Sequence, residues 1–473
     1  MNAEGSATTV ASAPWRASVL GRHWHEAVAL TLLLVAMAVL ALRELGDLSL
    51  WRDEVASVVF AKGSLGDLLN LVDRNRDSVG LANMATYYLL LHFWLALGES
   101  EAQIRLLSVI FGVASVVPVY FIGRRLAGWM AGALAAGIYV LIPYAIHYSQ
   151  EARGYSMATL AAGLLTWLVL IGVDRRRAWP WLAYGLVAAV GLYVHFFIGL
   201  VVAAHGAWLL ATRQVPPLMG ALAAVVPILL ALVPIPFIIS EFGGTQEWIP
   251  PLTWELLGRE LPALAGSQPL LLAFTVLGAV AIGLNRRDPR IWLLVACVVL
   301  PIVGAALVSL IKPIFIGRYL VVVLPHVALL AAAGIMAIHR PVVRVGATAA
   351  MAALLLFALP AAYADVRQQD WRGAGAWIAA AAQPGDQIVA AGPGRRSILY
   401  YLDRAGHEPL PTSKVGTAIE DDVAQRIWVP IDETAADTSA RSRLEQSFGV
   451  IQEREFGDSL TVLLMTRSAG GSG

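Results

Sequence analysis

The stretch AVALTLLLVAMAVLALRELGDLSLWRDEV, residues 27–55, decides how this sequence is interpreted. Its first part, Ala27–Leu45, is an apolar run close to the about 20 helical residues that cross a bilayer core. Ser49–Val55 follows and places two adjacent carboxylates, Asp53 and Glu54, at the membrane boundary. Charge at this depth often marks a functional site. The simpler alternative is a solvated loop that caps a helix.

The composition is that of a membrane protein. The chain has 473 residues, of which 58% are hydrophobic and only 14% charged, whereas soluble domains have about 25% charged residues. A net charge of +1 does not indicate a nucleic-acid partner. The single cysteine, Cys297, excludes an intramolecular disulfide and is expected to be a packing residue. Met1–Ser18 has no apolar core and is not expected to be a cleavable signal peptide. Residues 1–26 are predicted to form a disordered cytoplasmic N-terminus.

Further apolar runs of similar length recur along the chain, about eleven in all. They lie at residues 27–45, 103–122, 126–145, 155–173, 179–194, 196–212, 217–239, 269–284, 291–310, 319–338 and 343–363. These runs predict an α-helical polytopic membrane domain over residues 27–363.

Basic residues on alternate connections predict the orientation. Arg16 and Arg22 precede the first helix, and the other basic clusters on the same side include Arg124-Arg125, 175–177, Arg213, 286–290 and 340–344. Because short cytoplasmic connections collect Lys and Arg, the N-terminus of this plasma-membrane protein is expected to be cytoplasmic. An odd number of crossings then places the C-terminal region outside.

The opposite connections are longer and richer in chemistry. In the first of them, apolar spacing predicts short helices at 65–72 and 84–97 that lie in the interface plane, within residues 64–97. Tyr88 suits that depth, where aromatic rings lie among the headgroups.

The C-terminal region, residues 364–468, is predicted to be a small extracytoplasmic α/β domain, because short β-like runs alternate with helical segments. The expected strands are 387–391, 426–431, 449–456 and 459–465, and the expected helices include 370–382 and 396–402. Residues 469–473 should be a disordered tail.

The predicted outer face collects acids and cations. They are Asp53, Glu54, Glu151, Arg153, His195, Lys312 and Arg318. A carboxylate there can act as a general base on an attacking hydroxyl, and facing cations can neutralise a departing phosphate. Such a site would transfer a sugar or a phosphorus group from a membrane-borne carrier to an alcohol.

Four motifs carry a resemblance to a known family. In chain order they are Trp51-Arg52-Asp53-Glu54, Tyr87-Tyr88-Leu89-Leu90-Leu91-His92, residues 148–155 (YSQEARGY) and Gly317-Arg318-Tyr319-Leu320. Over residues 25–340 the chain resembles the GT-C membrane glycosyltransferases, specifically the protein mannosyltransferase and aminoarabinose transferase relatives often labelled RgtA/B/C/D-like.

The resemblance implies an inverting transfer of one sugar from a polyprenyl-phosphate carrier to an extracytoplasmic hydroxyl on a glycolipid, an envelope polysaccharide or a protein. It places the presumed base at Asp53. The adjacent Glu54 is the second candidate catalytic residue, which would orient Asp53 or an acceptor hydroxyl. It also places the donor phosphate on basic residues of later outer loops, namely Arg153, Lys312 and Arg318. Tyr88, Glu151 and His195 are further candidates for substrate contacts.

The chain departs from the family pattern before the Tyr-Tyr helix. Relatives often have an acidic residue or His-Pro-Pro there, whereas this chain has Leu81-Ala82-Asn83-Met84-Ala85-Thr86. Asp77 or Asp73 is the possible substitute for the second acid. No cofactor is expected to be required, and use of a divalent metal stays open.

Each candidate has a plainer interpretation. Asp53 can be a helix cap or a partner of Arg52, and Arg318 can be a cation extending toward the headgroups from a helix end. Arg153 can pair with Glu151, and His195 can be a satisfied interfacial histidine. The competing function is a transporter or flippase of a lipid-linked sugar, which favours internal repeats and a midplane site. The sequence shows neither, and a non-enzymatic scaffold would leave the clustered charges unexplained.

Overall fold

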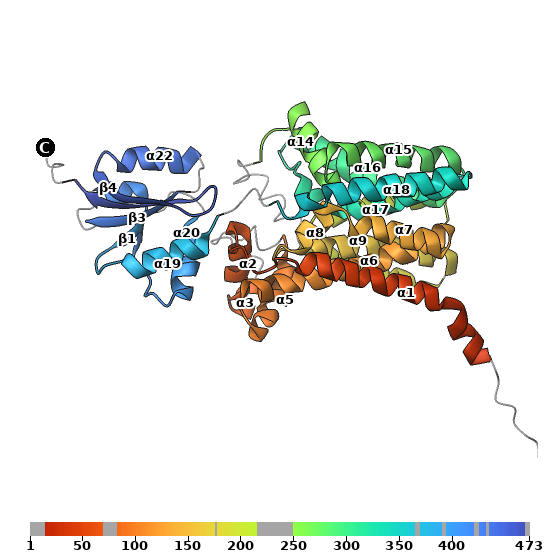
Figure 1. Ribbon diagram of the computed structural model, residues 1–473, viewed down its shortest axis with the longest axis horizontal. Helices are drawn as coiled ribbons and strands as arrows, with labels where there is room; N and C mark the ends of the chain where they lie inside the picture. The colour runs from red at the N-terminus through yellow and green to blue at the C-terminus, as the bar shows by residue number, and fades with distance from the viewer. Residues whose placement is uncertain are drawn as a thin grey trace, which may run out of the picture.

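The computed structural model describes most of the chain. The described residues are 15–69, 83–175, 177–214, 249–364, 369–389, 394–420, 425–431 and 435–468. They form a bundle of apolar helices and a separate α/β domain beyond one end of it (Figure 1). The predicted crossing at 217–239 lies outside the described residues.

Seven helical segments in the described part of the chain are long and apolar enough to span a membrane. They are Trp24–Leu42 of α1 (Trp15–Leu42), α6 (Glu101–Ala127), α9 (Tyr155–Arg175), α15 (Gln268–Asn285), α16 (Pro289–Ser309), Gly317–Ala337 (η2, Gly317–Val323, with α17, Leu324–Ala337) and Pro341–Ala362 (α18, Pro341–Ala358, with η3, Leu359–Ala362). All seven coincide with predicted runs, and the chain has a polytopic membrane fold.

The other predicted crossings take a different form. The run at 126–145 is a pair of helices, α7 (Trp129–Val140) and α8 (Pro143–Ser149), bent by 66°. The runs at 179–194 and 196–212 are the shorter helices α10 (Ala178–Val194) and α11 (Ile198–Thr212). Length and apolarity in the described residues therefore support seven spans, or eight with the bent pair, and the predicted number of eleven is not confirmed.

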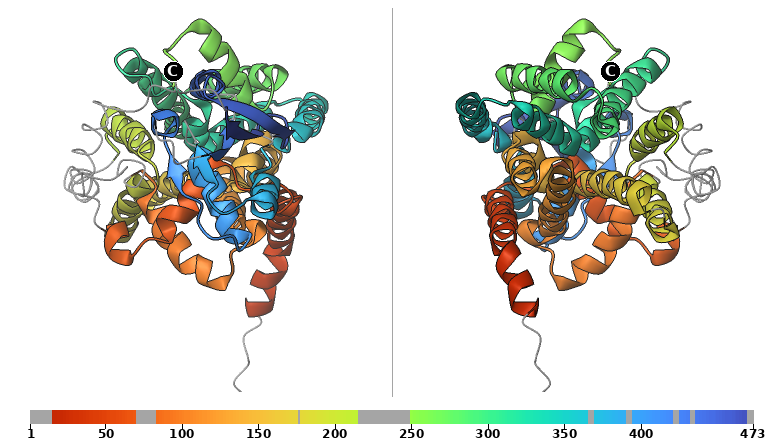
Figure 2. Two further views of the ribbon diagram at one scale, coloured as in Figure 1. Left: turned by 90° about the vertical axis from the view of Figure 1, so that its left-hand side faces the viewer. Right: turned by 90° about the vertical axis from the view of Figure 1, so that its right-hand side faces the viewer.

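Helix α1 begins earlier than predicted. Residues 15–26 continue it on the N-terminal side, so the prediction that all of residues 1–26 are disordered was wrong for this part. Trp24–Leu42 is mostly exposed, whereas α6, α9 and the span ending with α17 are largely buried. Figure 2 shows α1 at the edge of the bundle, where an apolar helix surface would contact lipid.

Close packing at the bundle centre requires small residues. A Cβ atom on Gly132 of α7 would lie 2.5 Å from the carbonyl oxygen of Tyr120 on α6, and one on Gly123 of α6 would lie 2.9 Å from that of Ala131. The two glycines therefore let the backbones of α6 and α7 approach, as is common between membrane helices.

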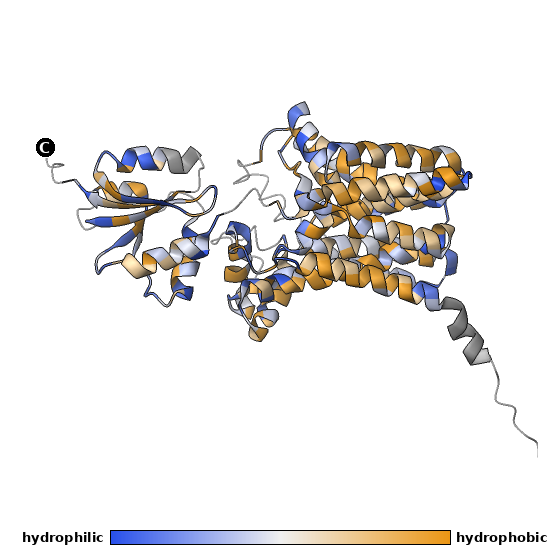
Figure 3. Ribbon diagram, in the orientation of Figure 1, coloured by the Kyte–Doolittle hydropathy of each residue, from blue (hydrophilic) through white to orange (hydrophobic). Residues whose placement is uncertain are grey.

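The basic connections gather at the N-terminal end of the bundle. Arg124 pairs with Glu26 at 2.6 Å, Arg125 pairs with Asp174, and Arg290 donates to the carbonyl of Arg125 at 2.9 Å. The polar ends of the helices in Figure 3 mark this side. One end of the bundle is therefore cationic, and the motifs of the predicted site lie at the other end.

Short helices cover that other end. They are α2 (Arg52–Ala61), α3 (Leu65–Leu69), α5 (Ala85–Trp94) with η1 (Leu95–Leu97), and α14 (Trp254–Ala265). The predicted interfacial helices correspond to α3 and α5. Asp53 and Glu54 lie in the first turn of α2, not in a loop.

The C-terminal domain contains one mixed sheet with the strand order β2-β1-β3-β5-β4. The strands are β1 (Gln387–Val389), β2 (Thr412–Ser413), β3 (Arg426–Ile431), β4 (Phe448–Glu455) and β5 (Thr461–Arg467). The first three pair in parallel, and β3, β5 and β4 pair antiparallel. The helices are α19 (Trp371–Ala381), α20 (Gly394–Arg404), α21 (Val415–Glu420) and α22 (Ala435–Leu444). Figure 1 shows α22 on one face of the sheet and α19 with α20 on the other.

Candidate active site

The N-terminus of α2 presents the acidic pair. Trp51 is the N-cap residue, and its backbone N–H donates to Glu54 Oε2 at 3.2 Å, as the N3 glutamate does in a capping box. Carboxylates in the first turn also interact favourably with the helix dipole. The two acids therefore start from the same turn, but their environments differ.

Glu54 is fully engaged in the protein interior. Only 1% of its side chain is exposed, and Arg105 of α6 grips it with two hydrogen bonds, from Nε to Oε1 at 2.8 Å and from Nη2 to Oε2 at 2.7 Å. The backbone N–H of Ala152 adds a third at 2.8 Å. Donors from the protein thus occupy both carboxylate oxygens of Glu54 and hold the start of α2 in place. These contacts suit an orienting role, and a direct part of Glu54 in catalysis stays a prediction.

Arg105 organises the whole segment before α2. Besides Glu54, its guanidinium donates to the carbonyls of Leu45, Leu48 and Ser49 at 3.0, 2.9 and 3.0 Å. Sequence reasoning missed this residue because it counted as part of the apolar run 103–122. A lone arginine inside an apolar run was the available signal, since such charges are costly and usually have a purpose.

Asp53 faces the opposite way from Glu54, toward two buried arginines. Its Oδ2 lies 3.4 Å from Nη1 of Arg318 and 4.0 Å from Nη2 of Arg153. Arg153 also donates to the backbone carbonyl of Asp53 at 3.3 Å. The side chain of Asp53 is 30% exposed, against 12% for Arg318 and 14% for Arg153. The structure thus brings two predicted cations, Arg153 and Arg318, from distant parts of the chain to the accessible carboxylate of Asp53.

Aromatic rings enclose the two arginines. Arg318 lies over the rings of Trp51 and Tyr319 at 5.6 and 5.8 Å, and Arg153 lies over Tyr155 at 5.7 Å. Cation–π contacts of this kind hold guanidinium groups without neutralising them.

Tyr88 of α5 belongs to the same surroundings. The residue is buried, and burial raises the pKa of its hydroxyl, on which the charges of Arg153 and Asp53 also act. Tyr88 is therefore neutral at physiological pH and lies near the predicted base, as expected for a substrate contact.

His195 lies between α10 and α11 and is buried against Tyr155 and Tyr319. Burial and the charges of Arg153 and Arg318 lower its pKa to about 3. Its Nδ1 accepts from the backbone N–H of Phe197 at 3.2 Å, so the neutral ring carries its proton on Nε2. That Nε2 is buried and has no hydrogen-bond partner among the described residues. His195 is thus a neutral donor toward the site rather than an acid or base.

Other predicted residues are placed less fully. Lys312 lies in the connection between α16 and η2, with its Nζ shielded from solvent, and its role as a phosphate ligand stays a prediction. Asp77 and Asp73 lie outside the described residues. Among the described residues, no group of three or more His, Cys, Asp or Glu side chains is placed to hold a metal ion. Whether the protein uses a divalent metal therefore stays open.

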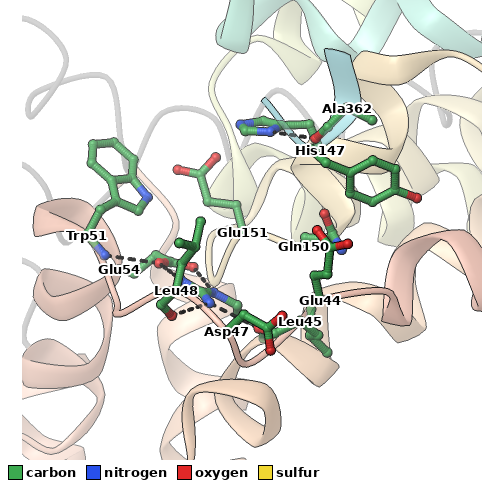
Figure 4. Close-up of a pocket in the computed structure, with 12 residues that line it drawn as sticks. Glu44, Leu45, Asp47, Leu48, Trp51, Glu54, His147, Gln150, Glu151 and Ala362 are labelled. Carbon is green, nitrogen blue, oxygen red and sulfur yellow. Dashed lines mark hydrogen bonds and ion pairs between the residues drawn. The ribbon is translucent and has the colours of Figure 1, made fainter. Parts of the chain in front are cut away.

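A polar cavity of about 200 Å³ adjoins the site on the other side of Trp51. Its lining includes Glu44, Asp47, His147, Gln150 and Glu151. Figure 4 shows the carboxylate of Glu151 projecting between Trp51 and His147. The predicted residue Glu151 therefore contributes to this second, acidic compartment.

An apolar groove of about 430 Å³ lies between α14, α15, α16 and the start of α17. Its lining includes Leu261, Leu264, Phe274, Val295, Val323 and Leu324. Val323 ends the 3-10 helix that begins with Gly317 and Arg318. One short helix therefore contributes both to the groove and to the arginine pair.

Glu260 of α14 holds the start of η2. Its Oε2 accepts a hydrogen bond from the backbone N–H of Gly317 at 2.8 Å. A Cβ on Gly317 would lie 2.6 Å from Tyr144 Oη and 2.9 Å from Glu260 Oε2, so a larger residue next to Arg318 would displace these two side chains. Sequence reasoning missed Glu260 because helical spacing in α14 does not reveal a partner 57 residues away.

Known proteins share this arrangement of helices. The family model described as dolichyl-phosphate-mannose-protein mannosyltransferase matches residues 83–239. A comparison of the sequence with curated proteins finds no significant match. The structure of ArnT from Cupriavidus metallidurans in the apo state superposes with a TM-score of 0.60 at 15% identity, over 93% of this chain and 98% of that chain. The chain has the fold of the GT-C membrane glycosyltransferases.

Two further structures with the GT-C fold agree with this assignment. ArnT from the same organism bound to undecaprenyl phosphate gives a TM-score of 0.58 at 16% identity, over 96% of this chain and 99% of that chain. The Archaeoglobus fulgidus oligosaccharyltransferase tethered with an acceptor peptide gives 0.55 at 9% identity, over 93% and 74%. The resemblance to the GT-C superfamily inferred from four motifs is confirmed.

Proposed function

We propose that this protein is an inverting glycosyltransferase that moves a single sugar from a polyprenyl-phosphate carrier to an extracytoplasmic hydroxyl acceptor. The observation that carries the proposal is the partly exposed Asp53 carboxylate facing the buried guanidinium groups of Arg153 and Arg318. A base and an anion-binding pair meet there at the end of the membrane bundle.

Each group has a defined part in the proposed reaction. Asp53 accepts the proton of the acceptor hydroxyl as its oxygen attacks the anomeric carbon. The bond from that carbon to the carrier phosphate oxygen breaks on the opposite face, which inverts the configuration. The phosphate leaves as an anion, and Arg153 and Arg318 neutralise the charge that develops on it.

The lipid part of the donor fits the apolar groove. Its lining between α14, α15, α16 and α17 is almost entirely aliphatic and aromatic, so burial of a polyprenyl chain there is favourable. The phosphate at the chain's end would then lie beside Arg318. Binding of undecaprenyl phosphate by ArnT, which has the same fold, supports a lipid phosphate as the ligand.

The acceptor would approach from the polar cavity beside Trp51, where Glu151 can bind its hydroxyl groups. We propose that this face and the C-terminal domain are extracytoplasmic and that the N-terminus is cytoplasmic. The cationic end formed by Arg124, Arg125 and Arg290 supports this orientation, because positive residues collect on the cytoplasmic side.

Replacing Arg318 with alanine should weaken donor binding by about tenfold to hundredfold, since a hydrogen bond to a charged group contributes about 1.5–3 kcal/mol. The affinity of the purified protein in detergent for undecaprenyl phosphate is the measurement. The matched control is Arg43→Ala, which removes an exposed arginine near the same end of the bundle and should leave the affinity unchanged. An unchanged affinity in Arg318→Ala would remove the phosphate assignment.

Replacing His195 with phenylalanine should lower donor affinity or turnover by about tenfold. The change removes the Nε2–H of His195, which would donate a hydrogen bond to a charged group of the substrate. The shape of the pH–rate profile between about pH 5 and 8 should not change, since a histidine with a pKa near 3 stays neutral throughout that range. His195→Gln keeps a side-chain N–H donor and should retain more activity. If the wild-type rate changes with pH near 6 and this change is lost in His195→Phe, His195 would instead be a catalytic acid or base.

A further inference from the structure

The α/β domain contacts the segment that leads into α2. Tyr401 of α20 accepts a hydrogen bond from the backbone N–H of Leu50 at 2.6 Å and donates to Glu101 Oε1 at 3.3 Å. Both Leu50 and Tyr401 are buried. A hydroxyl from the extramembrane domain therefore holds the backbone three residues before Asp53.

A second anchor lies one residue earlier. The hydroxyl of Ser49 donates to the carbonyl of Gln369 at 2.7 Å and accepts from the backbone N–H of Trp371 at 3.1 Å. Arg372 extends the contact by donating to the carbonyl of Asp47 at 2.9 Å. The N-terminal end of α19 thus binds the same segment as Tyr401.

The membrane helix α6 supports this segment from the other side. Glu101 and Arg105 are four residues apart and so lie on one face of the helix. Glu101 receives the hydroxyl of Tyr401, whereas Arg105 binds Glu54 and the carbonyl of Ser49. Ser49–Trp51 is therefore clamped between a membrane helix and the C-terminal domain.

We propose that Tyr401 is a positioning residue through which the C-terminal domain sets the place of Asp53. The inference rests on the proposed function, in which Asp53 is the base. Trp51 is the N-cap of the helix that carries Asp53, so a displacement at Leu50 passes directly into its first turn. Small misplacements of a reacting group reduce turnover strongly without changing substrate affinity.

The test uses full-length Tyr401→Phe, with Tyr400→Phe as matched control. The hydroxyl of Tyr400 accepts from Arg404 at 2.9 Å and has no recorded hydrogen bond to Ser49–Trp51 among the described residues. In Tyr401→Phe we expect kcat to fall about tenfold, with undecaprenyl phosphate affinity within about twofold of wild type. Amide hydrogen exchange in residues 46–54 should become faster. Tyr400→Phe should change none of these.

Ser49→Ala is a second variant, which removes the other anchor and should lower kcat in the same direction. The positioning role is wrong if Tyr401→Phe keeps wild-type kcat, or if donor affinity and exchange across the whole chain change together with kcat. Asp53→Asn separates the two proposals. Full transfer by Asp53→Asn would refute the base, whereas inactive Asp53→Asn with fully active Tyr401→Phe would refute only the positioning role.

Discussion

Asp53→Asn should reduce sugar transfer by about a thousandfold while undecaprenyl phosphate still binds. General-base catalysis contributes about 10²–10⁴ in rate, and an amide of the same size cannot accept the proton. The arginines that would hold the phosphate remain in place, because Arg318 also lies over Trp51 and Tyr319 and Arg153 over Tyr155. The measurement is single-turnover transfer from a polyprenyl-phosphate sugar, beside equilibrium binding of the sugar-free lipid phosphate.

Asp403→Asn is the matched control for this variant. Asp403 is an exposed carboxylate of α20 that lines neither the cavity beside Trp51 nor the apolar groove. Its replacement should leave the rate within about threefold of wild type, because a surface charge has weak effects. A flippase would move lipid in both variants and transfer sugar in neither. Wild-type transfer by Asp53→Asn would show that Asp53 is not the base.

Arg105→Ala should destabilise the protein by about 3–5 kcal/mol, the usual consequence of leaving one partner of a buried ion pair alone. Glu54 is 1% exposed and Arg105 9%, so solvent cannot replace the lost contacts. Transfer should disappear together with stability, since the segment before Asp53 loses the hydrogen bonds to three of its carbonyls. The loss is measured as the change in unfolding free energy in mixed micelles.

A double variant separates the structural role of Glu54 from a catalytic one. Glu54→Gln with Arg105→Met removes both charges at similar volume, a change that is often neutral or stabilising. We expect it to recover stability and part of the transfer activity relative to Arg105→Ala. Recovered stability without any recovered transfer would indicate that Glu54 takes part in the chemistry. Lys62→Ala breaks an exposed pair with Glu99 and should cost less than about 1 kcal/mol.

The site shows how far local sequence signals reach. Asp53, Arg153 and Arg318 were predicted from motifs and from their place on one side of the membrane, and the structure places both arginines within 4.0 Å of the Asp53 carboxylate. Glu54 was predicted to assist Asp53, by orienting it or an acceptor hydroxyl. Because adjacent residues of a helix point in different directions, Asp53 and Glu54 face different surroundings. Only the partners of each side chain show how the two acids differ.

The residues that sequence reasoning missed share a cause. Arg105, Glu260 and Tyr401 bind partners that are 51, 57 and 351 positions away. Nothing in the residues flanking them reveals those contacts. The metal question and the role of Asp77 depend on the same kind of distant pairing.

The sequence by itself determined the membrane class, most of the spans, the grouping of the site motifs at one end of the bundle and the family resemblance. These properties follow from local hydropathy and short motifs, since a run of apolar residues must enter lipid wherever the rest of the chain goes. The tertiary structure alone decided which acid is accessible, which arginines face it, and that the C-terminal domain touches the segment before it. Those outcomes depend on which distant groups share a buried space, where an unpaired charge is too costly to persist.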